Sequence, residues 1–516
     1  MPLLVVVLAG APVVSAAVLS LMDVRAAREL RAVHPAVRYA VAAHPWDDVS
    51  ALVTPEAIPR WLASCPGAAR VTINRGAAPL TADGMRVLVA GMARLRRLLF
   101  RDSDVSVGVV EAMPSTLEEL YMRHAREVPA GTSFAHLHGL KRLECPRVCM
   151  DDDMVATLPP SLVGLDTGDC FRLTPDASLA HLPNLVWLRG MGAKLGPGTI
   201  ESLTPGIQTL ILDNCSTLTA DTTFSGLPAL RALQLMSTHI SDATVASMPP
   251  SLESLSLIHC VDLTPDVRFD HLVRLRVINL TRTEVGAGAI ASLPPSLADA
   301  ILEHCTNLHP GTCFAHLTEL TNLKLKASSV DDGILRTLPH TLPCLDVGDC
   351  TCLSPTASYT HIASLHRLMA YGTQLNDAGL AALPPWLVVL NVWNCMNLTE
   401  AASFAPLVNL RDLVANNINI GDDAVYTMPP SLVNLQVAGC MPTSATLTFH
   451  HLPNLRCLDL TSAGIGDFSV PSLPLSLVNL CVDHCSRLTS DSAPHFLRLT
   501  NLTTFSSMDT AFRNTS

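Results

Sequence analysis

The sequence predicts an α/β solenoid, a coil of repeated segments whose short strands form a parallel sheet along the inner face. Two observations indicate it. The pentapeptide Met248–Leu252, MPPSL, returns in recognisable form every 45 residues, and a fixed period of this length is typical of repeat proteins. Each copy also carries apolar residues in the alternating order of a short strand. The nine copies start at Met113, Leu158, Leu203, Met248, Leu293, Leu338, Leu383, Met428 and Leu473.

The composition supports a large buried core. Hydrophobic residues make up 48% of the 516 residues and charged residues only 15%, so we do not expect a disordered chain. Aromatic residues account for 4%, which leaves leucine, valine, alanine and isoleucine to fill the core. The formal net charge is −11, and this acidic balance argues against nucleic acid or an anionic membrane as the main partner.

Each copy of the repeat consists of two similar halves, of 23 and 22 residues. In the first half of one copy, Leu252, Leu255 and Leu257 have the spacing of a short buried strand, and Cys260 follows at a bend. We expect every half-repeat to add one strand to the sheet and to return through a short helical turn. Such turns would begin at capping residues and end before the proline pair. The best predicted starts are Ser241-Asp242, Asp331-Asp332, Asn376-Asp377 and Gly421-Asp422-Asp423.

The pattern L-x-x-L-x-L-x-x-C-x-x-L-T between Leu252 and Thr264 resembles the leucine-rich repeat, in the cysteine-containing form found behind F-boxes. The pattern alone leaves the hand of the coil open, whereas the resemblance implies a right-handed leucine-rich-repeat horseshoe with the sheet on its concave side. The solenoid would span residues 113–516 as nine doublets of half-repeats, the last of them irregular. Residues 65–112 fit a degenerate N-terminal doublet, in which Val71, Ile73, Leu95 and Leu98 keep the apolar positions.

Residues 1–64 allow three interpretations. The uncharged stretch Met1–Met22 is compatible with a signal peptide cleaved after Ala17, and it is just long enough for a membrane-spanning helix. Apolar residues at helical spacing instead predict two or three short helices, which would form either a plain cap of the solenoid or an F-box. Residues 11–46 resemble an F-box, although Ala11 stands where the usual leucine precedes the proline. The residues that carry this resemblance are Pro12, Leu30, Arg31, Val33, Arg38 and Trp46.

Three ladders of side chains that recur at the same repeat position are expected to be structural. Ladder cysteines lie two strands apart, about 10 Å, which is too far for disulfides or a shared metal. We expect buried thiols that donate weakly to the loop backbone, an arrangement that favours a reducing compartment. The aromatic ladder is predicted to be a packing spine, and the histidine ladder to lie near backbone carbonyls. The cysteines are Cys170, Cys215, Cys260, Cys305, Cys350, Cys395, Cys440 and Cys485; the aromatic residues are Phe134, Phe224, Phe269, Phe314, Tyr359, Phe404 and Phe449; the histidines are His136, His181, His271, His316, His361 and His451.

Candidate binding residues lie between the buried leucines of the strands, where side chains point to the outer surface of the sheet. These positions vary between copies while the buried positions change little, and this pattern suits a surface that binds a protein partner. Tyr371 and Trp393 are the candidate aromatic anchors, and Lys324 and Lys326 form a basic pair. The predicted partner-binding residues are Asp166, Asp169, Asp213, His259, Glu303, His304, Lys324, Lys326, Asp346, Asp349, Tyr371 and Trp393.

Catalysis is not expected from this chain. The sequence contains no P-loop, no H-E-x-x-H and no G-x-S-x-G motif. Two carboxylate pairs, Asp166 with Asp169 and Asp346 with Asp349, lie on strands that we expect to be open to solvent, where little desolvation would tune a pKa. We therefore predict no enzyme activity, no cofactor and no metal.

The sequence supports two functional hypotheses. The resemblance implies an interaction scaffold similar to the substrate-recognition subunit of an SCF-type ubiquitin ligase, in which residues 11–46 would bind the F-box adaptor and the concave face a substrate. The alternative is a leucine-rich-repeat recognition protein with no ubiquitin-ligase role. We expect a cytoplasmic location, or secretion or surface display if Met1–Ala17 is a signal peptide. Nucleic acid and membrane partners are not expected.

Overall fold

The computed structural model describes residues 52–62, 69–123, 128–148, 150–440 and 444–510. The segment that resembles an F-box, residues 11–46, and the possible signal peptide Met1–Ala17 lie outside these residues. The chain divides into two compact units, Met1–Leu252 and Glu253–Ser516, which we call the N-terminal unit and the C-terminal unit.

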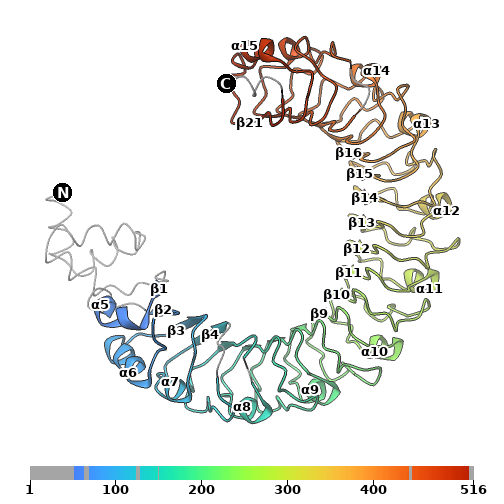
Figure 1. Cartoon of the computed structure of the whole chain (residues 1–516). Helices are drawn as coiled ribbons and strands as arrows, with labels where there is room; N and C mark the ends of the chain where they lie inside the picture. Colours follow the sequence, from blue (N-terminus) through green and yellow to red (C-terminus); the bar gives the residue numbers. More distant parts are fainter. Residues whose placement is uncertain (1–51, 63–68, 124–127, 149, 441–443, 511–516) are drawn as a thin grey trace, which may run out of the picture. The chain divides into compact units, whose positions relative to one another are not determined.

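The described part of the N-terminal unit is built on nine short parallel strands. Neighbouring strands pair in chain order, and their central leucines lie side by side, as Leu143, Leu165 and Leu188 do. In this unit the strands line one edge of the coil and the helices the opposite edge (Figure 1). The strands are β1 (Leu52–Val53), β2 (Arg70–Asn74), β3 (Arg97–Arg101), β4 (Glu119–Arg123), β5 (Arg142–Glu144), β6 (Gly164–Asp166), β7 (Trp187–Arg189), β8 (Thr209–Ile211) and β9 (Ala232–Gln234). The helices are η1 (Pro55–Ala57), α5 (Ile58–Leu62), α6 (Ala82–Gly91), α7 (Val107–Glu111), α8 (Asp152–Ala156), α9 (Pro197–Glu201) and α10 (Asp242–Ala246).

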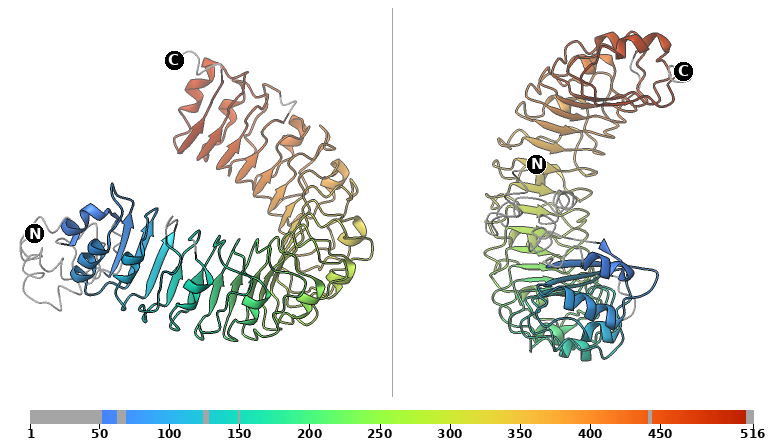
Figure 2. Two further views of the ribbon diagram at one scale, coloured as in Figure 1. Left: turned by 60° about the horizontal axis from the view of Figure 1, so that its bottom comes forward. Right: turned by 90° about the vertical axis from the view of Figure 1, so that its left-hand side faces the viewer.

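The described part of the C-terminal unit contains twelve parallel strands with the same arrangement. Leu323, Leu345 and Leu368 are paired neighbours at the centre of this sheet. Figure 2 shows the strand arrows of the unit stacked side by side. The strands are β10 (Ser254–Ser256), β11 (Val277–Asn279), β12 (Asp299–Ile301), β13 (Asn322–Lys324), β14 (Cys344–Asp346), β15 (Arg367–Met369), β16 (Val389–Asn391), β17 (Asp412–Val414), β18 (Asn434–Gln436), β19 (Cys457–Asp459), β20 (Asn479–Cys481) and β21 (Thr504–Ser506). The helices are α11 (Ala287–Ala291), α12 (Asp332–Leu335), α13 (Asp377–Ala381), α14 (Asp422–Tyr426), η2 (Val470–Ser472), η3 (Ser490–Ser492) and α15 (Ala493–Phe496).

Helices α8 to α14 occur once per doublet, in the second half-repeat. All four predicted starts are confirmed, and at three of them the side chains of Ser241, Asp331 and Asn376 accept hydrogen bonds from the third amide of α10, α12 and α13. Gly421 lies at the start of α14 without such a bond. The expectation of a helical turn in every half-repeat is wrong, because the first halves of these doublets return through turns. Prolines such as Pro265 and Pro355 lie in these first halves, and a proline disfavours helical backbone at the residue before it.

An aspartate at the first position of several helices binds the following half-repeat. Asp377 accepts hydrogen bonds from the backbone amide of Thr399, at 2.9 Å, and from its hydroxyl, at 2.5 Å. These contacts satisfy a backbone amide that has no strand or helix partner. They also join consecutive half-repeats at the edge opposite the sheet. The same double contact occurs in the pairs Asp152–Thr174, Asp332–Ser354, Asp422–Ser444 and Asp467–Thr489.

The aromatic ladder forms the predicted spine, since each of its seven residues is at most 2% exposed. A hydroxyl side chain just before the proline-pair pentapeptide fixes most of these residues through the backbone. The amide of Phe314 donates to Thr337 Oγ1 at 3.1 Å, and this hydroxyl donates to the carbonyl of Ile334 at 2.7 Å. The hydroxyl therefore ties the two halves of one doublet together. Position 382 carries alanine, so the corresponding contact to Tyr359 is not formed.

The ladder cysteines are buried free thiols, and the predicted donation to the backbone is confirmed. Cys350 Sγ donates to the carbonyl of Leu325 at 3.0 Å, and Cys440 Sγ donates to the carbonyl of Ala415 at 2.9 Å. Each thiol bonds to a residue 25 positions earlier, which belongs to the second half of the preceding doublet. The thiols thus connect consecutive doublets within the core.

The histidine ladder has the predicted structural position near backbone carbonyls at two described residues. His316 Nε2 lies 3.1 Å from the carbonyl of Leu293, and His451 Nε2 lies 2.9 Å from the carbonyl of Val425. Burial lowers the pKa of His361 and of His451 below the ordinary value of 6.5.

These lowered pKa values predict that the C-terminal unit loses stability in mild acid. The unfolded chain binds protons at His361 and His451 at a higher pH than the folded chain. The contribution of these two histidines to the free energy of unfolding is therefore fully present above the unfolded pKa. It is lost as the pH falls through 6.5 toward the folded pKa. Urea unfolding at pH 7.5 and pH 5.5 measures the difference, which His361→Gln should reduce. The exposed His366 provides the control variant His366→Gln. An equal loss of stability in wild type and His361→Gln would contradict this explanation.

Candidate functional site

Three rows of outward side chains at the ends of the strands cross the C-terminal sheet. The first row contains the last residue of each strand, such as Lys324 and Asp346, which are paired neighbours. The second row lies two residues further along the chain and contains Glu303, Lys326, Gly348, Tyr371 and Trp393. The third row contains the residue after that, such as His304 and Asp349. Backbone hydrogen bonds between the turns keep consecutive members of these rows adjacent.

Residues of the third row adopt left-handed backbone. The φ angle is 58° at His304, 56° at Asp349 and 58° at Asn394. Asparagine, aspartate and histidine are the non-glycine residues most often found in this conformation. The variation at this position, which the sequence analysis attributes to partner binding, therefore has a structural cause. Four predicted site residues have this left-handed backbone: Asp169, His259, His304 and Asp349.

This explanation predicts how substitutions of His304 affect stability. His304→Val should lower the free energy of unfolding by about 1–2 kcal/mol, because a β-branched residue is strained at positive φ. His304→Gly and His304→Asn should both stay within about 1 kcal/mol of wild type. Urea unfolding of the three variants measures the effect. Equal stability of the valine and asparagine variants would show that the backbone does not restrict this position.

Three predicted aspartates use their carboxylates to bind backbone amides. Asp166 accepts from the amide of Gly168 at 2.9 Å, Asp213 from the amide of Met236 at 2.8 Å, and Asp346 from the amide of Gly348 at 2.9 Å. Burial raises the pKa of all three carboxyl groups. The expectation of little desolvation is wrong at Asp166 and Asp346, because the side chains of adjacent turns cover the carboxylates. Asp166 and Asp213 are only 5% and 8% exposed, so they contribute little contact surface.

An aromatic pair forms the centre of the predicted site. The rings of Tyr371 and Trp393 have centroids 6.1 Å apart and are tilted by 35°. The Tyr371 ring lies over Gly348, where a Cβ atom would be 2.2 Å from the ring, so only glycine leaves room for it. Lys326 Nζ lies 5.4 Å from the centre of the Tyr371 ring and 3.9 Å from Asp349 Oδ2. Trp393 is 44% exposed and therefore presents a fixed apolar surface to solvent.

Charges of both signs surround this aromatic pair. Burial raises the pKa of Tyr371, and the carboxylates Asp346 and Asp349 raise it further. The carboxyl group of Asp346 is affected by Glu303, which raises its pKa, and by Lys324, which lowers it. The structure thus brings together eight residues, of which only Gly348 was not predicted; they are Glu303, Lys324, Lys326, Asp346, Gly348, Asp349, Tyr371 and Trp393. His259 is exposed on an earlier turn of the unit.

The N-terminal unit contains a charged network that the sequence analysis missed. Glu144 is 3% exposed and accepts hydrogen bonds from Arg123 Nη2 at 2.7 Å and Arg142 Nε at 2.8 Å. Asp166 Oδ2 lies 3.8 Å from Arg189 Nη1. Arg142 and Glu144 lie two residues apart on β5, whereas Arg123 belongs to the neighbouring strand β4, so its pairing with Glu144 depends on strand pairing rather than on any local motif. The register of the repeat supplies the signal that would reveal such pairs.

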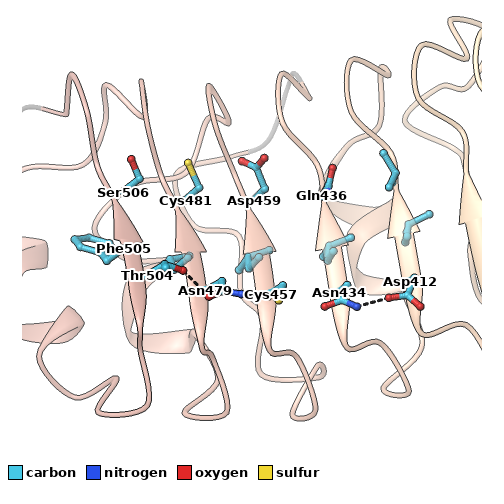
Figure 3. A pocket seen from close by; sticks show the side chains of 15 residues that line it. Asp412, Asn434, Gln436, Cys457, Asp459, Asn479, Cys481, Thr504, Phe505 and Ser506 are labelled. Carbon is cyan, nitrogen blue, oxygen red and sulfur yellow. Dashed lines mark hydrogen bonds between the residues drawn. The ribbon is translucent and has the colours of Figure 1, made fainter. Parts of the chain in front are cut away.

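A shallow groove of about 520 Å³ lies on the face of strands β17 to β21 (Figure 3). The first residues of the strands form one polar row, in which Asn434 donates to Asp412 and Thr504 donates to Asn479. Asp459 and Cys481 are the last residues of β19 and β20, so they belong to the first of the three rows described above, on the same face. The groove is open and its polar groups bind one another, so it offers hydrogen bonds but no enclosed cavity.

Within the described ranges, no three histidine, cysteine, aspartate or glutamate side chains are grouped closely enough to hold a metal ion. The same ranges contain no helix with the length and apolar character that a membrane crossing requires.

Neither a protein-family model nor a curated protein sequence matches this chain. Among solved structures, the chain is similar to TLR13 in a crystal structure of its complex with ssRNA13, with 19% identity, a TM-score of 0.54 and 90% of this chain covered. The match spans 65% of the TLR13 chain. The chain is also similar to CroV588, a circular LRR protein, with 15% identity and a TM-score of 0.53, over 88% of this chain and 68% of that one. At these identities the similarity concerns the fold, and the predicted α/β leucine-rich-repeat solenoid is confirmed.

Proposed function

We propose that this protein is an interaction scaffold that binds a protein partner through the sheet face around Tyr371 and Trp393. One observation carries the proposal: two aromatic rings are held in a fixed arrangement on an exposed row of charged residues. Tyrosine and tryptophan anchor protein interfaces because they provide a large contact area and lose little conformational entropy. Glu303, Lys324 and Lys326 would provide charge complementarity at the rim, and we expect no catalytic activity from this face.

The remaining predicted residues have smaller roles in this proposal. Asp346 and Asp349 stabilise the backbone turn and hold Lys326 near Tyr371, so they would act through the shape of the site. His304 would act through the backbone of its turn. Asp166 and Asp213 are almost fully buried and would act through the backbone amides that they bind. Asp169 belongs to the N-terminal unit and His259 to an earlier turn, so the proposed site does not include them.

Trp393→Ala is expected to weaken partner binding at least tenfold, as the loss of an aromatic anchor does in other interfaces. Affinity capture with the full chain, followed by titration of each captured protein, measures this effect. Phe171 is also an exposed aromatic residue, at 64%, but it lies in the N-terminal unit and provides the control Phe171→Ala. Partners that bind the control and lose affinity for Trp393→Ala would support the proposal. Undiminished affinity for Trp393→Ala would refute it.

The finer hypothesis is a substrate receptor of an SCF-type ubiquitin ligase, for which the resemblance of residues 11–46 to an F-box is the support. The chain should then capture an F-box adaptor, and deletion of residues 1–60 should abolish that capture while partners on the sheet face stay bound. Failure to bind any adaptor would leave the alternative, a leucine-rich-repeat recognition protein without a ligase role. Trp393→Ala separates the two questions because it should not affect adaptor binding.

RNA is a less suitable ligand for this face than protein. The similarity to TLR13, solved with ssRNA13, makes the comparison worth testing. In the present chain, however, Glu303, Asp346 and Asp349 surround the aromatic pair, and the net charge of −11 repels phosphates. An oligouridylate should therefore not compete with the protein partner.

A further inference from the structure

The N-terminal unit has a sheet face with a net positive charge, although the whole chain is acidic. Outward positions of strands β3 to β7 carry five arginines and three carboxylates. Their sum is 5 − 3, a net charge of +2 on these strands, whereas the whole chain has −11. The arginines are Arg97, Arg101, Arg123, Arg142 and Arg189, and the carboxylates are Glu119, Glu144 and Asp166. The carboxylates of Asp102 and Asp169 lie beyond the strand ends, and Asp169 is paired with Arg147 at 3.2 Å.

Ion pairs hold four of these five arginines in place: Arg97 pairs with Glu119 and Arg189 with Asp166, whereas Arg123 and Arg142 share one carboxylate. Glu144 is buried and accepts hydrogen bonds from both Arg123 and Arg142, so one negative charge fixes two guanidinium groups. The side chains of Arg123 and Arg142 remain 57% and 46% exposed, which leaves donors directed to solvent. Arg101 is the register partner of Arg123 on the adjacent strand, is exposed, and forms no ion pair within the described residues.

We propose that this arginine face binds an acidic peptide segment in extended conformation. Four strand spacings separate β3 from β7, about 19 Å, and an extended chain of about six residues covers that distance. Carboxylates on alternate residues of such a segment would be about 7 Å apart, so three of them would lie along the row of guanidinium groups. A distributed row of charges suits several carboxylates better than one compact anion. Charge-assisted hydrogen bonds to arginine supply the affinity.

The aromatic residues on this face favour peptide over single-stranded RNA. RNA binding of this kind requires exposed rings on which bases stack. Tyr121 is 8% exposed, and its ring is 5.5 Å from Arg97 Cζ and 5.7 Å from Arg142 Cζ. The Trp187 ring lies against Gly164 and has the guanidinium of Arg142 at 4.8 Å. Both rings are thus already engaged within the protein.

Fluorescence anisotropy with the full chain tests this proposal. The probes are a labelled twelve-residue polyglutamate, the matching polyglutamine, and a twelve-nucleotide oligouridylate. We expect polyglutamate to bind much more tightly than polyglutamine, and we expect added salt to weaken that binding. Arg101→Gln should weaken polyglutamate binding about tenfold, which is the loss of affinity expected when one charge-assisted hydrogen bond is removed. Its thermal unfolding should match wild type, because Arg101 has no ion pair to lose within the described residues.

Arg86→Gln is the matched control, since Arg86 is exposed on helix α6 and pairs with Asp83 at 2.5 Å. Polyglutamate affinity should be unchanged in this variant and in Trp393→Ala, which makes the result independent of the function proposed for the C-terminal unit. Equal affinity for polyglutamate and polyglutamine, or equal losses in Arg101→Gln and Arg86→Gln, would overturn the proposal. Tighter binding of oligouridylate that Arg101→Gln abolishes would overturn it in favour of nucleic acid.

Discussion

Phe314→Ala is expected to lower the free energy of unfolding of the surrounding repeats by about 3–5 kcal/mol. The ring of Phe314 is fully buried in the aromatic spine, and its removal leaves a cavity that the neighbouring turns cannot fill. The backbone amide would keep its bond to Thr337, so the loss reports packing alone. Because repeat arrays often unfold in parts, hydrogen exchange in strands β12 to β14 is the suitable measurement, alongside urea unfolding.

The chain supplies its own control for this substitution. Leu179 occupies the equivalent position in an earlier doublet and is buried there, so leucine is compatible with the spine. Phe314→Leu should therefore reduce the loss to about 1–2 kcal/mol. Similar losses in the alanine and leucine variants would mean that the cavity does not determine the stability of these turns.

Alkylation should separate the cysteines into two groups whose rates differ by at least about a thousandfold. Burial raises the pKa of Cys215, Cys350 and Cys485 from 9.0 to about 12, and the thiolate is the reactive form. Three pKa units reduce the thiolate fraction about a thousandfold, and lack of access slows the reaction further. Cys313 and Cys352 are exposed and should react within minutes at pH 8.

Iodoacetamide labelling followed by peptide mass spectrometry measures these rates in the native chain. In denaturant the slow group should react as fast as Cys313, which shows that folding alone protects it. Rapid native labelling of Cys350 would contradict the burial of the cysteine ladder. Labelling of Cys350 in Phe314→Ala at low urea would report the local opening that the first experiment seeks.

The fold was predictable because one period determines it. A strict 45-residue spacing places the positions of Leu255, the ladder cysteines and the aromatic spine in the same environment in every copy. One structural interpretation of these positions therefore applies to every copy of the repeat. The leucine-rich-repeat solenoid followed from that pattern and is confirmed. The absence of helices from many first half-repeats did not follow, because it depends on local prolines and on hydrogen bonds to the preceding half-repeat.

The site was predictable only in part, for two physical reasons. Variation between copies has more than one cause, and at His304 and Asp349 the left-handed backbone selects the residue type independently of any partner. Contacts between turns also depend on side-chain direction, which the pattern does not give. The position of Tyr371 over Gly348 and the sharing of Glu144 by two arginines became visible only in three dimensions. The role of the site residues in binding stays a prediction.

The contacts between half-repeats set the step by which such an array can grow. Within a doublet, the hydroxyl of Thr337 accepts a hydrogen bond from the amide of Phe314. Cys350 and Ser354 instead form hydrogen bonds with residues of the preceding doublet. A single half-repeat added by mutation would face the wrong neighbour and leave these groups without partners. Gains and losses of length during evolution should therefore occur in whole 45-residue blocks. A designer who wishes to lengthen the binding face should insert the same block.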